Sequence, residues 1–261
     1  MLLAVDVGNT QTKLGVFGGI DLLHEWRAST EARRTADELA LMFGEFLSTA
    51  GLSFSQQITG VAISSVVPQS TQELREMTLR YFGFPAVVVE PGVRTGLAVA
   101  TDNPREVGAD RIANAVAARD VFPECAAVVV DVGTAIKVDA LSARGEFLGG
   151  AIAPGMSTSA SALFESTQQL RRVELVAPPT VIGRSTVTSI QSGVVYGTAA
   201  LVDGLVDRVA VELSAEVGVV ATGGLAPAVV DHCRSVERLE PALTLLGLRL
   251  IFERNTAREE A

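Results

Sequence analysis

Three short turns along the chain combine an acidic or hydroxyl side chain with glycine. They are the segments Asp6–Thr10, Asp131–Thr134 and Thr222–Gly224. A turn of this kind offers backbone N–H groups and hydroxyls to an anion at a point where no side chain blocks its approach. An aspartate at the end of the preceding strand can hold a hydrated Mg²⁺ against phosphate groups. One such turn alone is most often only a turn, whereas three in this order predict a site for the phosphates of a nucleotide.

The first two turns repeat one another. Ala4–Lys13 aligns with Val129–Lys137 after the deletion of one residue, and Asp6 and Asp131 are 125 residues apart, close to half of the 261-residue chain. The tripeptide Asp-Val-Gly is common, so chance could produce this match, but the shared strand context favours duplication of a supersecondary unit. Nucleotide binding between two duplicated halves requires a phosphate turn from each half, and the repeat supplies both.

The turns are set among elements that alternate along the chain. Apolar, β-favouring runs on both sides of each phosphate turn predict strand–turn–strand units. Elsewhere strand-like runs alternate with helical ones, and the capping boxes Thr35–Glu38 and Ser70–Glu73 predict helix starts. This alternation indicates a layered α/β fold. The predicted strands are 2–7, 12–17, 60–67, 86–89, 127–131 and 218–222, and the predicted helices follow the two capping boxes and cover 112–119, about 185–213 and about 244–253.

Composition argues against several function classes. The net charge of −9, from 30 acidic and 21 basic side chains, repels phosphate backbones and argues against nucleic acid as the main partner. No run of about 18 apolar residues is present, and Asp6 interrupts an N-terminal run that lacks a basic region, so we expect neither a membrane protein nor a signal peptide. Cys125 and Cys233 form no CxxC pair, which fits a reducing cytoplasm. His24 and His232 lack the spacing of metal ligands, so structural or surface roles are expected.

Familiar catalytic motifs are missing from the sequence. It contains no GxxxxGK[ST] loop and no GxGxxG, GxSxG or HExxH motif. With two histidines, a Ser-His-Asp hydrolase is disfavoured. Lysine is also scarce, because only Lys13 and Lys137 occur among 21 basic residues. A codon bias toward arginine explains that scarcity, yet each lysine closes one copy of the repeat.

Through its three glycine-containing turns the chain resembles the superfamily of acetate kinase, sugar kinases, heat-shock chaperones and actin. Asp6–Thr10 and Asp131–Thr134 resemble its two phosphate motifs, and Thr222–Gly224 resembles its adenosine motif. The resemblance implies an α/β fold of two duplicated actin-like (ribonuclease H-like) halves, 1–118 and 119–261, each a mixed sheet flanked by helices.

Further segments narrow the resemblance to type III pantothenate kinases. They follow the order of that family over nearly the whole chain, and the Gly-Ala-Asp-Arg block within Asp102–Ile112 is the most specific of them. The segments are Ile63–Pro68, Asp102–Ile112, Gly149–Gly155, Leu170–Leu175 and Gln191–Gly193. The resemblance implies ATP-dependent phosphorylation of pantothenate to 4′-phosphopantothenate, which opens coenzyme A biosynthesis.

The resemblance also implies roles toward the substrate. Asp110 is the base that orients or deprotonates the primary hydroxyl of pantothenate, and its expected helix start favours the ionised form that a base requires. Arg111 binds the substrate carboxylate through paired hydrogen bonds, together with the backbone of Gly108 and Ala109. Taken alone, Asp110 is explained better by helix capping, and the resemblance reverses that preference; Arg111 taken alone could form a surface ion pair. The further implied substrate contacts are Thr101 and Thr186.

Other residues are implied to bind the nucleotide and cations. Asp6 lies near Mg²⁺, through water, and Lys13 supplies a positive charge where negative charge builds up. Asp131 matches a position that binds a monovalent cation, K⁺ or NH₄⁺. Lys13 could instead be a solvated surface lysine, Thr134 a turn stabiliser and Thr186 a helix cap. The implied ATP contacts are Asp6, Val7, Gly8, Asn9, Thr10, Gln11, Thr12, Lys13 and Thr134.

The chain departs from the family at two places. Thr101 stands where the family has an aromatic residue before the Asp-Asn-Pro run, which puts one substrate contact in question. Val132, Ile136 and Lys137 replace Phe, Thr and Thr of the usual second phosphate motif. We hypothesise that the Lys137 ammonium lies near Asp131 and partly replaces the monovalent cation; the alternative is that Lys137 faces solvent.

Other functions and assemblies stay open at this point. A regulatory or accessory protein that has kept the fold and lost activity is one alternative, and a kinase for another small hydroxyl or carboxylate substrate is a second. Gly193, Gly197 and Gly204 recur inside the long predicted helix and permit close approach of another backbone. A contact within one subunit and a homodimer contact both fit, and the resemblance implies a homodimer.

Overall fold

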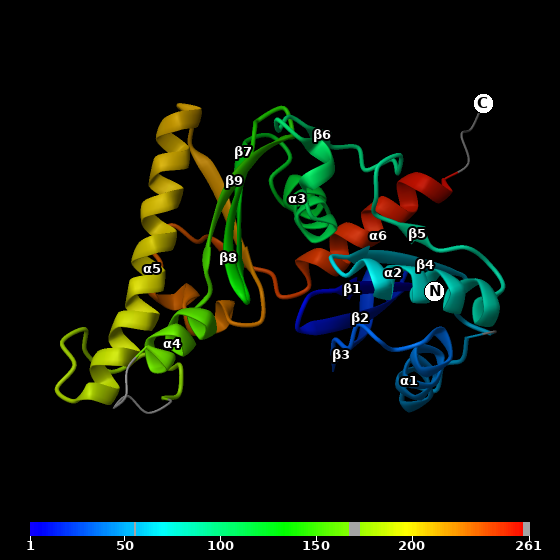
Figure 1. Cartoon of the computed structure of the whole chain (residues 1–261). Coiled ribbons are helices and arrows are strands. Elements are labelled where there is room, and N and C mark those ends of the chain that lie inside the picture. Colours follow the sequence, from blue (N-terminus) through cyan, green and yellow to red (C-terminus); the bar gives the residue numbers. More distant parts are fainter. Residues whose placement is uncertain (55, 167–172, 258–261) are drawn as a thin grey trace. The chain divides into compact units, whose positions relative to one another are not determined.

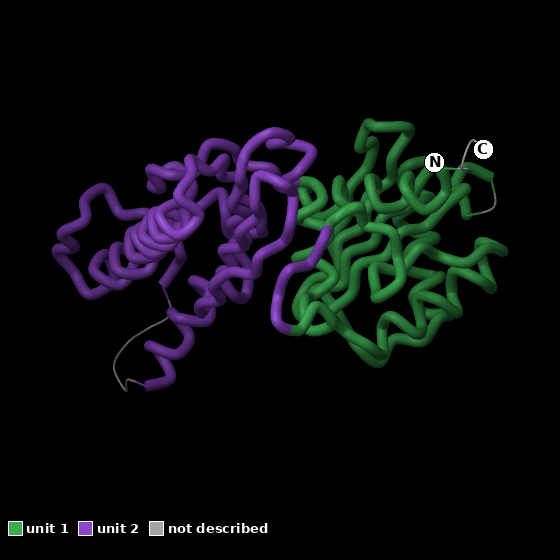
Figure 2. Tube along the Cα trace, turned by 90° about the horizontal axis from the view of Figure 1, so that it is seen from above, with its two compact units in different colours: residues 1–97, 103–117, 243–261 green, residues 98–102, 118–242 purple. Residues whose placement is uncertain are grey.

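The computed structural model of this chain describes residues 1–54, 56–166 and 173–257, so the first part of the Leu170–Leu175 motif lies outside the described residues. Its contacts divide the chain into two compact units, coloured separately in Figure 2. Unit 1 comprises Met1–Leu97, Asn103–Ala117 and Leu243–Ala261, and unit 2 comprises Ala98–Asp102 and Ala118–Ala242.

Unit 1 is built on a five-stranded mixed sheet with the order β3-β2-β1-β4-β5 (Figure 1). β1 pairs antiparallel with β2 and parallel with β4, while β2 pairs antiparallel with β3 and β4 parallel with β5. The Val and Leu side chains on one face of this sheet pack against two helices. The strands are β1 (Leu2–Val7), β2 (Gln11–Gly18), β3 (Asp21–Ser29), β4 (Gly60–Ser65) and β5 (Val87–Val88), and the helices are α1 (Ala36–Thr49) and α2 (Pro68–Met77), which the π-helical turn Thr78–Phe82 extends.

The opposite face of the unit 1 sheet is covered by the C-terminal helix α6 (Leu243–Thr256). Leu245 lies against Gly15 of β2, and Phe252 lies against Gly60 of β4, where a Cβ atom would collide with its ring. Two glycines, on the strands to either side of β1, thus make room for the apolar side of α6. This helix belongs to unit 1 although it ends the chain, because its apolar residues complete the unit 1 core.

Unit 2 repeats the arrangement on a six-stranded sheet with the order β11-β10-β7-β8-β9-β6. One face packs against α4 and the long helix α5, through a core of valines and alanines. On the other face, Phe122, which directly follows α3, lies against Gly218 of β10. The elements are β6 (Ala98–Val99), β7 (Ala126–Val132), β8 (Ala135–Leu141), β9 (Glu146–Pro154), α4 (Met156–Glu165), α5 (Thr186–Leu213), β10 (Val217–Thr222) and β11 (Arg238–Leu239), with 3₁₀ turns at Ala226–Ala228 and Val230–His232. The 3₁₀ turn Pro104–Glu106 and the start of α3 (Ala109–Val121) belong to unit 1, and the last residues of α3, from Ala118 on, belong to unit 2.

The predicted duplication is confirmed strand by strand. The order β3-β2-β1-β4-β5 of unit 1 matches β9-β8-β7-β10-β11 of unit 2. In unit 1 Asp6 pairs with Lys13, and in unit 2 Asp131 pairs with Lys137, so both hairpins have the same register. The predicted α/β fold with two mixed sheets flanked by helices is therefore present.

The compact units differ in extent from the expected halves 1–118 and 119–261. The segment Leu243–Ala261 belongs to unit 1, for the packing reason given above, and Ala98–Asp102 belongs to unit 2 because β6 pairs with β9. Four strands and one helix were not predicted, namely β3, β6, β9, β11 and α4, and the short 3₁₀ turns were not predicted either.

One predicted helix start is correct and one is wrong. Thr35 and Glu38 form the predicted capping box at the start of α1. The expected box at Ser70 is absent, because α2 already begins at Pro68, whose ring suits the first helical position. Glu73 instead accepts a hydrogen bond from the backbone N–H of Ala36, 2.8 Å away. It thereby provides an acceptor for one of the N–H groups in the first turn of α1 that have no partner within the helix.

The cysteines and histidines have the expected structural settings. Cys125 is exposed and Cys233 is partly buried, and neither forms a disulfide. His24 stacks on Trp26, and His232 contacts the edge of Tyr196.

None of the helices in the described ranges combines the length and apolar character that a bilayer-spanning segment needs.

Candidate active site

The phosphate hairpin of unit 1 is a tight turn between β1 and β2. The N–H of Gly8 donates to the carbonyl of Gln11 at 3.0 Å, and a Cβ atom at Gly8 would lie only 3.1 Å from that oxygen. Thr30, which directly follows β3, supports the turn, because its N–H donates to Thr10 O and its hydroxyl bonds the Thr12 hydroxyl at 2.9 Å. Asn9, Thr10 and Gln11 are exposed, so the polar groups of the turn are available to a ligand.

The strand pairing fixes what surrounds Asp6 at the end of β1. Asp6 pairs with Lys13 on β2 and with Ser64 on β4. Residues paired across neighbouring strands point to the same face of a sheet. The two predicted residues Asp6 and Lys13 therefore lie side by side, and the structure adds Ser64, which sequence reasoning did not assign to the site.

The Gly-Ala-Asp-Arg block forms the start of α3, as predicted. Asp110 lies in the first turn of α3, and its Oδ1 accepts the N–H of Arg111 at 2.9 Å. A Cβ atom at Gly108 would lie 2.5 Å from that oxygen and 3.7 Å from Val66. The Asp110 carboxylate therefore lies close to the backbone at Gly108, and a side chain there would displace it. All four residues of the block are half-buried, so their polar groups stay within reach of a small molecule.

Helix α6 fixes the position of α3 in unit 1. Thr244 donates a 2.7 Å hydrogen bond to Oδ1 of Asn114, and both residues are buried. The backbones also touch, because a Cβ atom at Gly247 would collide with the carbonyl of Ala113. The start of α3, with Asp110, is thus held by a contact that joins residues about 130 positions apart in the sequence.

The phosphate hairpin of unit 2 carries an ion pair. Nζ of Lys137 lies 3.0 Å from Oδ2 of Asp131, and their side chains are 21% and 17% exposed. The hypothesis that Lys137 lies near Asp131 is confirmed, and the alternative in which it faces solvent is wrong. The turn itself repeats that of unit 1, since Gly133 N–H donates to Ala135 O at 3.0 Å.

Thr134 is held from a second direction. Its carbonyl accepts the N–H of Gly155 at 3.0 Å and the hydroxyl of Thr158 at 2.7 Å. A Cβ atom at Gly155 would lie 2.5 Å from the same carbonyl. The Gly149–Gly155 motif therefore anchors the second phosphate turn, a connection that the sequence alone did not reveal.

The predicted adenosine motif lies next to the second aspartate. Gly223 has a φ of +102°, and a Cβ atom there would lie 2.6 Å from Oδ1 of Asp131. Leu225 N–H donates to Val132 O at 3.0 Å and ties the two segments together. Thr222 pairs with Asp131 across β10 and β7. Both oxygens of the Asp131 carboxylate thus have close neighbours, Lys137 on one side and Gly223 on the other.

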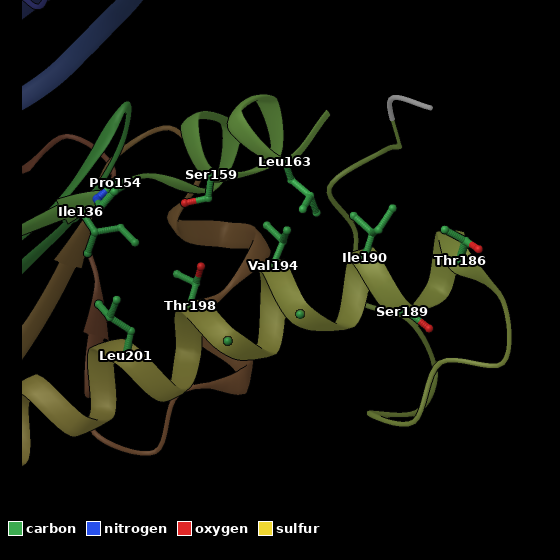
Figure 3. Close-up of a pocket in the computed structure, with 12 residues that line it drawn as sticks. Ile136, Pro154, Ser159, Leu163, Thr186, Ser189, Ile190, Val194, Thr198 and Leu201 are labelled. Carbon is green, nitrogen blue, oxygen red and sulfur yellow. The ribbon is translucent and has the colours of Figure 1, made fainter. Parts of the chain in front are cut away.

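The remaining predicted residues are in unit 2. Thr186 is the first residue of α5, whose cap is the neighbouring Ser185, so Thr186 is not itself the cap. It lies at one end of a pocket of about 670 Å³ between α4 and α5, with Ile136 at the other end (Figure 3). Thr101 lies beside Gly149, and its hydroxyl oxygen is buried without a hydrogen-bond partner in the described part of the chain.

The described residues contain no cluster of three or more acidic, histidine or cysteine side chains that could hold a metal ion directly. A lone carboxylate at the end of β1 suits a cation that keeps most of its water, as Mg²⁺ does. Asp6 is such a carboxylate, beside the exposed turn Asn9–Gln11.

Comparisons with known proteins agree with this geometry. The profile of the family described as type III pantothenate kinase matches residues 2–208. A type III pantothenate kinase of Streptomyces coelicolor is 52% identical over 265 residues, covering 99% of this chain and 100% of that protein.

Solved structures share the fold at low identity. Component A of the (R)-2-hydroxyglutaryl-CoA dehydratase of Acidaminococcus fermentans has a TM-score of 0.60 at 16% identity, covering 98% of this chain and 99% of that one. The polyphosphate/ATP-glucomannokinase of an Arthrobacter strain has a TM-score of 0.51 at 15% identity, covering 97% of each chain. The duplicated sheets thus have the actin-like fold, and with two matched phosphate hairpins, a Gly-Ala-Asp-Arg helix start and this full-length similarity, the chain belongs to the type III pantothenate kinase family.

Proposed function

We propose that this protein transfers the γ-phosphoryl group of ATP to the primary hydroxyl of pantothenate and so opens coenzyme A biosynthesis. The observation that carries the proposal is the Gly108–Arg111 block at the start of α3, in a chain 52% identical to a type III pantothenate kinase over its whole length. No observation favours the accessory role or another kinase substrate over this one.

Asp110 is the proposed base. It lies in the first turn of α3, where the helix end carries a partial positive charge. An ionised carboxylate within hydrogen-bond reach can orient the substrate hydroxyl and accept its proton during transfer. The adjacent Arg111 binds the substrate carboxylate, and Gly108 and Ala109 offer backbone groups beside it. Thr101 and Thr186 are the further proposed substrate contacts.

The two hairpins are the proposed phosphate-binding elements. In unit 1 the turn after Asp6 presents backbone N–H groups and exposed polar side chains, and Lys13 adds a positive charge. In unit 2 Thr134 contributes to ATP binding from a turn that Gly155 and Thr158 hold in place. A bound Mg²⁺ would neutralise phosphate charge, and Asp6 would hold it through water. The proposed contacts in unit 1 are Asp6, Val7, Gly8, Asn9, Thr10, Gln11, Thr12 and Lys13.

The role of Asp131 in cation binding needs revision for this chain. A monovalent cation at Asp131 would compete with the Lys137 ammonium, which already lies 3.0 Å from Oδ2. We therefore propose that Lys137 supplies most of the positive charge that K⁺ or NH₄⁺ would otherwise bring to this carboxylate.

The glycines of α5 support a homodimer. A Cβ atom at Gly193 or Gly197 would meet nothing within 4 Å, so no described segment of this chain uses the close approach that these glycines permit. The same two residues line the pocket of Figure 3. We propose that a second copy packs on this side of α5, and that the dimer resides in the cytoplasm.

A substrate panel tests the proposed function. ADP release would be followed by a coupled assay with Mg-ATP, a K⁺ salt and, separately, pantothenate, glucose and acetate. We expect release with pantothenate alone and the appearance of phosphopantothenate in the same samples. Release with glucose or acetate instead would assign a different kinase activity, and release with none of them would favour the accessory role.

A further inference from the structure

Each unit contains the same row of three side chains across neighbouring strands. In unit 1 the row is Lys13, Asp6 and Ser64, on β2, β1 and β4. In unit 2 it is Lys137, Asp131 and Thr222, on β8, β7 and β10. The duplication thus extends beyond the lysine and aspartate to a hydroxyl on the third strand.

The rows lie on the face of each sheet that is turned away from the main apolar core. In unit 1, Gly15 is two residues after Lys13 on β2 and Gly60 is four residues before Ser64 on β4, so each glycine shares a sheet face with its neighbour in the row. Both glycines contact α6 rather than α1 or α2. In unit 2 Gly218 precedes Thr222 by four residues and contacts Phe122 rather than α5. The side chains of Ser64 and Thr222 therefore do not pack in the valine-rich cores.

Both hydroxyl oxygens are buried and lack a hydrogen bond. Ser64 is 0% and Thr222 is 2% exposed, and neither Oγ atom has a partner in the described part of the chain. A buried hydroxyl without a partner destabilises a fold relative to an apolar side chain of the same shape. Thr101 is a further hydroxyl of this kind, whereas the buried hydroxyl of Thr78 does have a partner, Leu74 O at 2.6 Å. A buried hydroxyl without a hydrogen bond thus occurs at equivalent positions of both units. Because it does not stabilise either fold, we expect its role to lie in ligand binding.

We propose that Ser64 and Thr222 are positioning residues for nucleotide binding, each in its own unit and each acting through the aspartate beside it. When Asp6 turns its oxygens toward phosphate-bound, hydrated Mg²⁺, the Ser64 hydroxyl donates a hydrogen bond to the carboxylate and fixes its orientation. Thr222 does the same for Asp131, opposite the Lys137 ammonium. The hydroxyls of Ser64 and Thr222 form no hydrogen bond in the ligand-free protein, because they donate to the aspartates only when the Mg-nucleotide is bound. The inference rests on the proposed use of Mg-ATP, not on the identity of the acceptor.

Binding of Mg-ADP in the absence of pantothenate tests the proposal. The variants Ser64→Ala and Thr222→Val remove the hydroxyls, Thr222→Ser keeps one, and Thr78→Val is the matched control, a buried hydroxyl that has a partner. Calorimetry would give the Kd for Mg-ADP and for ADP with EDTA, and thermal unfolding would give the Tm of each ligand-free protein.

The proposal predicts opposite effects on binding and stability. Ser64→Ala and Thr222→Val should raise the Kd for Mg-ADP about tenfold, the effect of one charge-assisted hydrogen bond. Their ligand-free Tm should be equal to or above that of the unmodified protein. Ser64→Ala should leave the Kd for ADP with EDTA within about twofold, and Thr222→Ser should keep near-normal Mg-ADP binding. Thr78→Val should lower the Tm and leave binding unchanged.

Two results would overturn the proposal. One is an unchanged Kd for Mg-ADP in both Ser64→Ala and Thr222→Val. The other is a lower Tm in these variants, like that of Thr78→Val, which would make the hydroxyls structural. Failure of the unmodified protein to bind Mg-ADP would overturn this inference and the proposed function together, whereas a different acceptor substrate would leave this test intact.

Discussion

Thr244 of the C-terminal helix donates a hydrogen bond to Asn114, which lies one helical turn after Asp110 on α3. This contact, with the backbone approach of Gly247 to Ala113 beside it, connects the end of the chain to the proposed base. The helix α6 is therefore part of the structure that positions the proposed base, and we expect substitutions in α6 to affect the proposed active site.

Gly247→Ala should disturb this helix contact. Its methyl group would collide with the Ala113 carbonyl, so we expect a loss of about 1–3 kcal/mol in the free energy of unfolding, as in other overpacked sites. The matched control is Gly204→Ala in α5, whose Cβ would meet only the mobile end of Arg208 at 3.3 Å. That change should be neutral or stabilise by up to about 1 kcal/mol, because alanine favours helix. Equal urea midpoints for the two variants would contradict the proposed contact.

Lys137→Thr should create a dependence on monovalent cations. In the unmodified protein the kinase rate should vary little with K⁺, because the Lys137 ammonium already neutralises Asp131. Without this ammonium the carboxylate needs another cation, and K⁺ should raise the rate of the variant about tenfold. Rates would be measured against K⁺ concentration, with choline chloride holding the ionic strength constant. Strong K⁺ dependence of the unmodified protein would reject this assignment.

Asp203 should stabilise unit 2 in a pH-dependent way. It is 5% exposed and accepts hydrogen bonds from the backbone N–H groups of Arg234 and Ser235 and from the Ser235 hydroxyl, at 2.8–3.1 Å. Burial alone would raise the pKa of Asp203, but these hydrogen bonds outweigh it and hold the pKa below the usual aspartate value. Asp203→Asn should therefore cost about 2–3 kcal/mol of unfolding free energy at pH 7.

The sign of the pH effect follows from the lowered pKa. The carboxylate stabilises the fold above its unfolded pKa of about 4, and the contribution is lost as the pH falls through the folded pKa. The stability difference between the unmodified protein and Asp203→Asn should thus be constant above about pH 5 and shrink below about pH 4. Asp207→Asn is the control, since Asp207 is exposed and pairs only loosely with Arg234. A difference that grows on acidification would contradict this account.

The sequence predicts those parts of the site that depend on local chemistry. The two hairpins follow from Asp-Val-Gly turns between apolar runs, and the start of α3 follows from the Gly-Ala-Asp-Arg block. The neighbours Ser64 and Thr222 do not follow, because they reach the aspartates through parallel pairing of strands far apart in the chain. The placement of α6 in unit 1 is equally non-local, since its apolar residues would suit either sheet.

Local signals also fail where a stronger neighbour competes. Ser70–Glu73 has the pattern of a capping box, but Pro68 already begins the helix and Glu73 bonds to α1 instead. β3 was missed because none of its residues is fully buried: half-buried residues alternate with exposed ones, and most of the exposed ones are polar or charged. The Lys137–Asp131 pair, in contrast, was predictable, because the one-residue deletion in the repeat still leaves the lysine opposite the aspartate.

The most direct test of the central claim is the turnover number of Asp110→Asn with saturating Mg-ATP and pantothenate, beside Asp120→Asn at the exposed end of the same helix. If the carboxylate at the start of α3 orients and deprotonates the alcohol, kcat should fall by about 10²–10⁴ in Asp110→Asn and stay normal in Asp120→Asn, with Mg-ADP affinity preserved in both. An Asp110→Asn protein that phosphorylates pantothenate at the unmodified rate would contradict the account.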